Sequence, residues 1–504
     1  MSDHDMIQTD VLVIGAGPVG LTLACDLARR GITCRVIERD TAPNRASKAK
    51  TIQSRSLEVL DDLGAVDHVV RTGVADLPVR FHDRSGDVVD RPSIVVRARD
   101  TFHTPYPDAL WIGQFDVEHA LRERLRELGG MVEYGVAAVD LTQDTEGVAV
   151  TLRTAQGDST IRARYVVGTD GGKSTTRKLI DLHLEGQTYE SQRWYIGDVT
   201  VADLDHSHMH IWPSDKGMLV LTPLPNSDLF QLQTPIPAQA QPAEPSLELY
   251  QQLLDERAAD VKLTSANWLS IYRVNVRMVT DYRRGRVLLA GDAAHVHSPA
   301  GGQGMNTGIQ DAYNLGWKLG AVVEGADPGL LDTYGAERIP VARRVLALST
   351  DKIDRTTERM GGDIDELSSA LGEIADDAVT TGLGIHYHPK QAAANSAAPV
   401  AGDRAPNVTG LAGPEFSGDL FDLTRGPHWN LIAFDNDDPT IADNLDPIHM
   451  RVHRISSTTA RGILDGRGEF QEIYAPRPGE LILIRPDGHI AARGTEIQPP
   501  LLWQ

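Results

Sequence analysis

The segment VLVIGAGPVG, residues 11–20, decides the fold of the N-terminal part of the chain. VLVIG is a short β-branched run that ends in glycine, which predicts a buried parallel strand. After GAGPVG, the stretch LTLACDLARRG has helical periodicity and ends at Gly31, a natural helix stop, and TCRVIERD predicts the next strand. Together these signals predict a strand–helix–strand unit within about thirty residues.

GAGPVG has the form G-x-G-x-x-G in the context that a dinucleotide-binding fold requires. Gly15 permits the tight turn, Gly17 lets the backbone approach a pyrophosphate, and Gly20 allows close packing of helix and strand. The helix N-terminus offers free N–H groups and a positive dipole end. Glu38, at the end of the second strand, suits the ribose hydroxyls of an adenosine, although a tight turn beside a surface acid remains the alternative. The candidate cofactor-binding residues here are Gly15, Gly17, Pro18, Val19, Gly20, Glu38 and Arg39.

A second glycine-rich junction, GDAAHVHSPAGGQGMN, occupies residues 291–306 between the predicted strand RGRVLLA and the predicted helix DAYNLGWKLGAVVEG. One such junction indicates a nucleotide, and two indicate a single long ligand held at both ends. GAGPVG by itself does not distinguish NAD from FAD. A third motif, GTDGGKSTTR at residues 168–177, has the form G-x-D-G-x-x-S-x-x-R.

The length and the net charge of the chain limit the number of domains and the kinds of partner that we expect. A chain of 504 residues has room for about three domains. The formal net charge of −21 disfavours nucleic acid and anionic membranes as main partners, because both would be repelled. No apolar stretch approaches the roughly twenty residues that span a bilayer, and MSDHDMIQTD lacks the pattern of a signal peptide. We therefore expect a soluble, cytoplasmic protein with no membrane or nucleic-acid partner.

The two cysteines, Cys25 and Cys34, form no Cys-x-x-Cys pair, so we expect no cysteine-based metal site and no dithiol centre. Both fall inside the first strand–helix–strand unit, where small apolar side chains are expected. We interpret them as structural filling and predict no metal site.

The chain divides into three predicted domains. Residues 1–180 and 281–390 form a discontinuous cofactor-binding domain, and part of 76–110 joins the substrate domain. Residues 181–280 form that substrate domain, because RWYIGDVTVADL, HMHIWPSDKGMLVLTPLP and DLFQLQTPI alternate like an antiparallel sheet. HPKQAAANSAAPVAGDRAP predicts a linker, and residues 400–504 alternate strand and turn signals like a small α/β domain. FDVEHALRERLRELGG predicts a helix that Asp116 is suited to cap.

The three motifs, in this order, closely resemble the flavin-dependent aromatic hydroxylases, the single-component FAD monooxygenases of the p-hydroxybenzoate hydroxylase type. The resemblance covers most of residues 8–350. It implies an α/β fold in which a Rossmann-like FAD-binding domain carries an inserted antiparallel substrate domain. The C-terminal domain resembles the thioredoxin-like domain of larger members, such as phenol, 3-(3-hydroxyphenyl)propionate and aromatic-polyketide hydroxylases.

The implied activity uses FAD, O₂ and NADPH or NADH to hydroxylate a phenolic or polycyclic, polyketide-like aromatic compound, a reaction type found in antibiotic biosynthesis, through a flavin C4a-hydroperoxide. The alternative is a flavin-binding protein without turnover that stabilises a reactive intermediate of a biosynthetic pathway. A flavin halogenase is disfavoured because W-x-W-x-I-P is absent, and a plain NAD dehydrogenase leaves the second glycine junction unexplained. We expect a monomer or a homodimer.

The resemblance also assigns cofactor contacts. Asp292 would hydrogen-bond the ribityl chain of FAD. Arg45 would lie near the pyrophosphate and ribityl region, and Gln114 would contact the flavin chain. Asp170 would take part in the binding of FAD and the nicotinamide cofactor. The alternative is that Asp170 only caps the following turn and that Arg177 pairs with a carboxylate. The residues expected along the isoalloxazine ring are Pro299, Gly302, Gly304, Met305 and Asn306.

For catalysis the resemblance points to Pro299, whose carbonyl would lie beside the oxygen-reaction site, and to Arg45. His297 departs from the family pattern and is either an aid to substrate ionisation or a packing residue. His295 is interpreted as structural. Strand alternation places His208, His210 and Trp212 on one face, without showing whether that face is the pocket, and leaves Arg273 and Arg277 either structural or substrate-facing. The substrate sheet also supplies Tyr195 and Met218.

Overall fold

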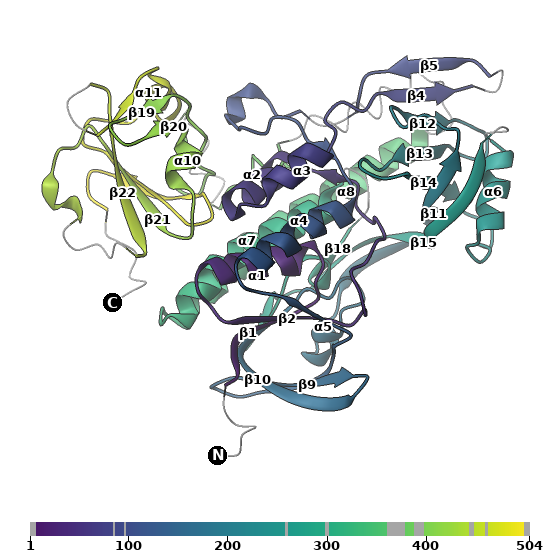
Figure 1. The fold of residues 1–504 in the computed structure, drawn as a ribbon, viewed down its shortest axis with the longest axis horizontal. Coiled ribbons are helices and arrows are strands. Elements are labelled where there is room, and N and C mark those ends of the chain that lie inside the picture. The colour runs from purple at the N-terminus through teal and green to yellow at the C-terminus, as the bar shows by residue number, and fades with distance from the viewer. Residues whose placement is uncertain are drawn as a thin grey trace.

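The computed structural model describes residues 7–83, 86–94, 97–257, 261–297, 302–359, 378–387, 398–442, 448–458 and 462–497. Figure 1 shows three parts side by side: a central α/β part that holds the N-terminus, an antiparallel sheet flanked by α6, and a separate C-terminal α/β part.

The central sheet has eight strands, and five of them run parallel in the order β17-β10-β1-β2-β7. β1 is buried along nearly its whole length, as VLVI predicts. An antiparallel hairpin and an edge strand complete the sheet. The strands are β1 (Thr9–Ile14), β2 (Cys34–Glu38), β7 (Val132–Tyr134), β8 (Ala137–Gln143), β9 (Val148–Thr154), β10 (Gly157–Gly168), β16 (Arg283–Arg284) and β17 (Val287–Leu289).

Helix α1 packs on β1 and β2 and lies against α4 and α7. α7 is buried along almost its entire length, which is typical of a central helix. The helices of this part are α1 (Pro18–Arg29), α2 (Ser54–Leu63), α3 (Val66–Thr72), α4 (Gln114–Glu127), α5 (Thr175–Leu179), α7 (Gln303–Val323) and α8 (Asp332–Arg359), with short 3₁₀ turns η1 (Asp100–Phe102), η2 (Gly291–Ala293) and η3 (Pro328–Leu331).

Helix α4 corrects one local prediction. It begins at Gln114 with Gly113 as its N-cap, so the predicted cap at Asp116 is wrong. Asp116 lies inside the first turn, and its carboxylate accepts a hydrogen bond from Asn226 Nδ2 at 3.4 Å. A negative charge in the first turn still interacts favourably with the helix dipole.

The second sheet is largely antiparallel and has the order β18-β15-β11-β14-β13-β12-β4-β5. The segment that follows α3 contributes β4 and β5, and β4 pairs in parallel with β12. Helix α6 (Leu247–Asp255) covers one face. The strands are β4 (Val79–His82), β5 (Val88–Arg91), β11 (Glu185–Ala202), β12 (Met209–Trp212), β13 (Leu219–Pro223), β14 (Leu229–Ile236), β15 (Lys262–Met278) and β18 (His295–Val296). A small ladder joins β3 (Thr51–Ile52) to β6 (Leu110–Trp111).

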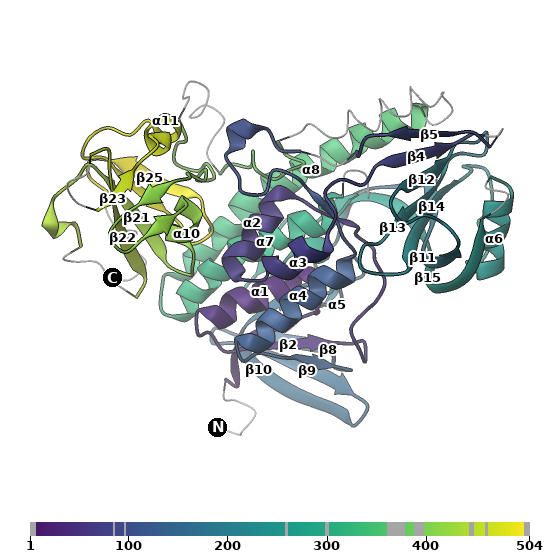
Figure 2. The same ribbon diagram turned by 45° about the horizontal axis from the view of Figure 1, so that its top comes forward.

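The C-terminal part has a seven-stranded mixed sheet in the order β20-β19-β23-β22-β21-β24-β25. Figure 2 shows strands of this sheet, β21, β22, β23 and β25, together with α10 and α11. Ion pairs join the C-terminal part to the central part: the buried pair Arg404 to Glu58 at 2.6 Å and the partly buried pair Arg485 to Glu337 at 2.7 Å. Its elements are β19 (Leu411–Ala412), β20 (Ser417–Gly418), α10 (Leu420–Thr424), β21 (Trp429–Phe434), η4 (Pro439–Ala442), β22 (Met450–Ser456), β23 (Ile463–Asp465), α11 (Glu469–Tyr474), β24 (Leu481–Ile484) and β25 (Ile490–Gly494).

Both cysteine thiols are held in their neutral form. Burial raises the pKa of the Cys25 and Cys34 thiols to about 12, so both stay neutral.

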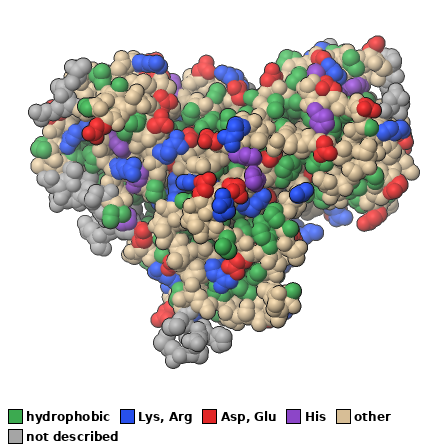
Figure 3. All heavy atoms as spheres, in the orientation of Figure 1, with side chains coloured by type: hydrophobic (Ala, Val, Ile, Leu, Met, Phe, Trp, Pro, Cys, Tyr) green, Lys and Arg blue, Asp and Glu red, His purple; other side chains and the backbone are tan. Residues whose placement is uncertain are grey.

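Figure 3 shows acidic and basic side chains interspersed over one face of the molecule. Within the described residues, every helix is too short or too polar to cross a bilayer.

Candidate active site

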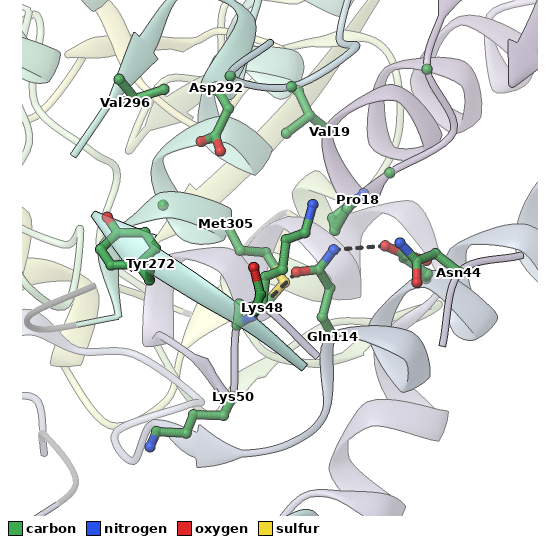
Figure 4. Close-up of a pocket in the computed structure, with 18 of the residues that line it drawn as sticks. Pro18, Val19, Asn44, Lys48, Lys50, Gln114, Tyr272, Asp292, Val296 and Met305 are labelled. Carbon is green, nitrogen blue, oxygen red and sulfur yellow. Dashed lines mark hydrogen bonds between the residues drawn. The ribbon is translucent and has the colours of Figure 1, made fainter. Parts of the chain in front are cut away.

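A cavity of about 970 Å³ lies between the central part and the antiparallel sheet. The loop after β1 and the start of α7 line one region of it, and strands β11 to β15 line another. Figure 4 shows Pro18, Val19 and Asp292 grouped together, while Lys50 extends away from them. The cavity thus joins a region lined largely by backbone to a region lined by side chains of the antiparallel sheet.

The first glycine loop opens into this cavity. Gly15 has a φ of +108°, and a Cβ there would lie 2.6 Å from the Thr169 carbonyl oxygen, so the turn requires glycine. A Cβ on Gly17 would meet no atom within 4 Å, which leaves its backbone open to the cavity. A Cβ on Gly20 would lie 2.0 Å from the Gly15 carbonyl oxygen, so Gly20 serves packing and does not line the cavity.

Helix α1 presents its first turn to the cavity without a side-chain cap. Gly17 is the N-cap and Pro18 is the first helical residue, so free N–H groups of this turn are available to an anion. Glu38 lines the cavity beside the loop, accepting hydrogen bonds from Ala16 N at 2.9 Å and Asp40 N at 3.1 Å. A carboxylate has about four lone-pair positions, so Glu38 keeps acceptor capacity for hydroxyls. Arg39 is exposed at the same margin.

The second glycine junction meets the cavity from the opposite side. Asp292 is exposed within η2, and its carboxylate points into the cavity (Figure 4). Gly302 has a φ of +62° and caps α7, which also lacks a side-chain cap. The backbone from Gly302 to Met305 lines the cavity, so a second helix N-terminus faces it.

Asn306 lies behind this junction rather than in the cavity lining. It is buried, its Oδ1 accepts from Gln53 N at 2.8 Å, and its Nδ2 donates to Gly302 O at 2.7 Å. These bonds fix the start of α7 against the segment around β3. Residues 298–301 lie outside the described residues, and the expectation for Pro299 falls among them.

The loop that precedes those residues is held from two sides. His295 is buried and bonded to Asp311 at 2.7 Å, and Arg338 donates to the other oxygen of Asp311 at 2.7 Å, so His295 is structural as expected. Tyr272 of β15 donates its hydroxyl to the His297 carbonyl oxygen at 2.7 Å. The His297 side chain is largely buried, lines the cavity and approaches Gly304 at the start of α7.

Asp170 lines the cavity and also organises the turn that leads into α5. Its carboxylate accepts from Ser174 Oγ at 2.5 Å and from Thr175 N at 2.8 Å, which is the capping arrangement. Among the residues that the structure describes, no carboxylate accepts a hydrogen bond from Arg177. Arg177 donates instead to the carbonyl oxygens of Ala293 at 3.0 Å and Gly172 at 2.9 Å, which links this turn to η2. Burial lowers the pKa of Arg177.

The structure does not bring Arg45 into the cavity lining. Arg45 is exposed, whereas Lys48 and Lys50 of the same segment line the cavity, Lys48 beside Gln114 (Figure 4). Gln114 donates to Glu118 Oε1 at 2.8 Å and accepts from Ala49 N at 3.2 Å. Burial raises the pKa of Glu118 to about 7.

The apolar wall of the cavity comes largely from the antiparallel sheet, with Ile94 and Trp111 added from outside that sheet. On β12 the face toward the cavity carries Met209 and Ile211, whereas His210 and Trp212 point to the opposite face, where both stack with His82. His208 and Tyr195 are likewise absent from the lining, while Arg277 contributes to it. The apolar and aromatic residues of the wall are Ile94, Trp111, Trp194, Ile196, Met209, Ile211, Met218, Val220 and Trp268.

A polar cluster around Lys50 interrupts this apolar wall. The sequence analysis did not predict this cluster. Lys50 donates to Thr222 Oγ1 at 3.0 Å and to Gln233 Oε1 at 2.8 Å. Asp198 accepts from Ser47 N at 2.6 Å on the neighbouring strand β11. Burial lowers the pKa of Lys50 to about 7 and raises that of Asp198 to about 7. Gln231 and Gln233 alternate in LFQLQ, which was the one sequence signal for a polar stripe on this face.

The described cavity fits FAD. Open backbone at Gly17 and the uncapped start of α1 suit a diphosphate, Glu38 suits a ribose, and Asp292 suits ribityl hydroxyls. The uncapped start of α7 suits an electron-rich flavin edge. Among the described residues, no group of three or more His, Cys, Asp or Glu side chains is placed to hold a metal ion.

Comparisons with known proteins agree with this fit. Residues 8–349 match the family described as FAD binding domain. A flavin-dependent monooxygenase of Mycobacteroides abscessus is 37% identical over 488 residues, 95% of this chain and 96% of the relative. The 6-methylpretetramide 4-monooxygenase of Streptomyces rimosus is 34% identical over 526 residues, 96% of this chain and 90% of the relative. The solved structure of the OxyS anhydrotetracycline hydroxylase from Streptomyces rimosus has a TM-score of 0.76 and 31% identity, covering 96% of this chain and 95% of that one.

Proposed function

Because this chain belongs to the FAD-binding domain family and is a flavin-dependent aromatic monooxygenase, we propose that it hydroxylates a polycyclic phenol of the aromatic-polyketide type. O₂ supplies the oxygen atom and NADPH or NADH supplies the electrons. The names of its relatives do not favour the alternative of a flavin-binding protein without turnover.

The observation that carries this proposal is the broad apolar wall of the cavity. Three tryptophans, Trp111, Trp194 and Trp268, line it together with methionines and branched aliphatic side chains. Flat aromatic compounds pack well against such a surface, and flexible methionines accommodate fused rings. Two relatives are named for 6-methylpretetramide and anhydrotetracycline, which supports a substrate with several fused rings.

The lining of the cavity supports the cofactor roles that the resemblance implies. The backbone N–H groups of Gly17 and Val19 would bind the diphosphate, and Glu38 would accept from the adenosine ribose. Asp292 would accept from the ribityl chain, and the backbone from Gly302 to Met305 would face the ring. When bound, FAD would accept two electrons from the nicotinamide and would then activate O₂.

The chain's own contribution to the reaction is placement and the exclusion of water. The apolar wall holds the aromatic ring opposite the loop that carries Asp292 and His297, and it displaces solvent from the reaction site. Tyr272 fixes that loop to the substrate sheet through the His297 carbonyl. Catalytic contributions from Pro299, Arg45 and His297 remain proposals taken from the sequence.

We further propose that residues 1–180 and 281–390 form the FAD-binding domain and that 181–280, with part of 76–110, forms the substrate domain. The pairing of β4 with β12 supports this division. Residues 400–504 would form a thioredoxin-like domain that supports the FAD-binding domain through the Arg404–Glu58 pair, in a monomer or a homodimer.

A direct experiment tests the substrate proposal. The purified protein is scanned for FAD absorbance, and NADPH or NADH consumption is then measured with phenols of one to four fused rings. We expect bound FAD and the largest stimulation of consumption, with a product heavier by one oxygen atom, for the polycyclic compounds. A clear preference for single-ring phenols would contradict the proposed substrate class.

A further inference from the structure

Lys50 lies where the segment before β3 meets the antiparallel sheet. Its Nζ donates to Thr222 Oγ1 on β13 and to Gln233 Oε1 on β14, and it lies 5.8 Å from the centroid of the Trp111 ring. An amine nitrogen has three directions besides its bond to carbon. Among the residues that the structure describes, the third direction has no hydrogen-bond partner, and Lys50 lines the cavity.

The groups packed around Lys50 are nearly all neutral. Thr222 on β13, Gln233 on β14 and Trp111 on β6 carry no charge, and Asp198 on β11 is the charged group that acts on Lys50. Burial lowers the pKa of Lys50 to about 7 and raises the pKa of Asp198 to about 7, so the two groups titrate as a coupled pair near neutral pH. A large fraction of Lys50 is therefore neutral at pH 8 and able to accept a proton.

We propose that Lys50 binds an ionisable hydroxyl of the aromatic substrate, removes its proton and holds the resulting oxyanion. This inference rests on the proposed function, because it assigns the part of the substrate that the apolar wall leaves unexplained. A phenol or an enol fused to the ring system has the chemistry that this site recognises.

The proton transfer balances without another reactant. The O–H bond of the hydroxyl breaks, the proton moves to the lone pair of Lys50 Nζ, and the bonding electrons stay on the oxygen. The ammonium then donates a charge-assisted hydrogen bond to the oxyanion. Ionisation makes the ring richer in electrons, so the ring attacks an electrophilic oxygen more readily.

Two other titratable groups at the cavity are less suited to this role. Tyr272 already donates its hydroxyl to the His297 carbonyl, and burial raises its pKa far above neutrality, so it stays protonated. Glu118 is bonded to Gln114 on α4, which lies on the cofactor side of the cavity. Lys50 instead stands on the apolar wall, among the side chains that would contact the rings.

The test uses oxidised holoprotein and alizarin, a fused-ring phenol whose visible band shifts to the red on ionisation. Bound alizarin is titrated between pH 5 and pH 10 in the wild type and in Lys50→Met. We expect the ionisation midpoint of the bound dye to rise by about 1–3 pH units in Lys50→Met, because a nearby cation stabilises the anion by that amount. Affinity for alizarin at pH 8 should fall about 10- to 100-fold. Affinity for 1,2-dimethoxyanthraquinone, which has no acidic proton, should stay the same.

Control variants separate the chemistry from folding. Lys216→Met removes an exposed lysine in the turn between β12 and β13 that pairs with Glu256 at the end of α6, and it should leave the midpoint unchanged. Lys50→Arg should keep the midpoint low, because it retains the cation. Gln233→Glu offers a second route: a carboxylate beside Lys50 offsets its charge and should raise the midpoint as Lys50→Met does, so the test survives if Lys50→Met does not fold.

An equal midpoint in the wild type and Lys50→Met would overturn the proposal. So would a wild-type protein that binds alizarin only in its neutral form, or that does not bind it. The titration needs no turnover. A wild type that shifts the midpoint but oxidises no NADPH or NADH with aromatic compounds would therefore refute the proposed function while leaving the Lys50 site intact.

Discussion

The substitution Gly17→Val tests the assignment of the first glycine loop. Gly17 has ordinary backbone angles, with φ −74° and ψ −177°, and a Cβ there meets no protein atom within 4 Å. The fold therefore has room for a side chain at this position. The two methyl groups of valine would instead occupy the space through which a diphosphate approaches the N–H groups of α1.

The expected loss follows from the hydrogen bonds that the valine would block. Each charge-assisted bond from a backbone N–H to a phosphate oxygen contributes about 1.5–3 kcal/mol. Losing two of them costs about 3–6 kcal/mol, and about 1.4 kcal/mol corresponds to a tenfold change in Kd. Gly17→Val should therefore weaken FAD binding by about 10²- to 10⁴-fold, while the thermal unfolding of the FAD-free protein should remain close to that of the wild type.

The assay is reconstitution of FAD-free protein followed by quenching of flavin fluorescence. Gly335→Val in α8 is the matched control, because a Cβ there makes only an ordinary contact of 3.6 Å with Ile339. Gly20→Ala should behave differently and destabilise the fold itself, since its Cβ would lie 2.0 Å from a carbonyl oxygen. Wild-type FAD affinity in Gly17→Val would show that this loop does not bind the diphosphate.

Three further predictions follow from other contacts. Asp292→Ala should weaken FAD binding about 10- to 100-fold by removing one charge-assisted acceptor; unchanged affinity would count against the ribityl assignment. Tyr272→Phe should free the loop that carries His297, and the fraction of NAD(P)H oxidised without product should rise at unchanged FAD content; full coupling would exclude this role. The Arg485 guanidinium holds the pKa of Glu337 down at about 2, against an ordinary value of 4.5. Glu337→Gln should therefore lower the free energy of unfolding by about 3 kcal/mol at pH 7. The difference should shrink as the pH falls from 4.5 towards 2, and a difference independent of pH over that range would contradict the ion-pair account.

Local signals were sufficient to predict much of the fold. VLVI, GAGPVG and the glycine at position 31 each act within a few residues, so the first strand and helix follow from the sequence alone. The second glycine junction was predicted to lead into a helix at DAYNLGWKLGAVVEG, and the structure shows that helix beginning earlier, at Gln303, directly after Gly302 with its positive φ. These predictions hold because backbone conformation near a glycine is decided locally.

The substrate side depends on contacts between distant residues. Strand β12 is buried on both faces, so alternation could not tell that Ile211, rather than His210, lines the cavity. The partners of Lys50 lie 172 and 183 residues away along the chain. Arg45 and Lys48 share a segment without periodicity, and only the fold decides which of them lines the cavity.

As a flavin-dependent aromatic monooxygenase, this chain uses FAD to transfer one atom of O₂ to an aromatic ring. The most direct measurement incubates the FAD-loaded protein with ¹⁸O₂, NADPH or NADH and a polycyclic phenol, and follows the product by mass spectrometry. We expect one ¹⁸O atom, in a new hydroxyl group on the ring, for each nicotinamide oxidised in the coupled reaction. Product oxygen that comes from water, or nicotinamide oxidation that the phenol does not stimulate, would show that the chain is not such a monooxygenase.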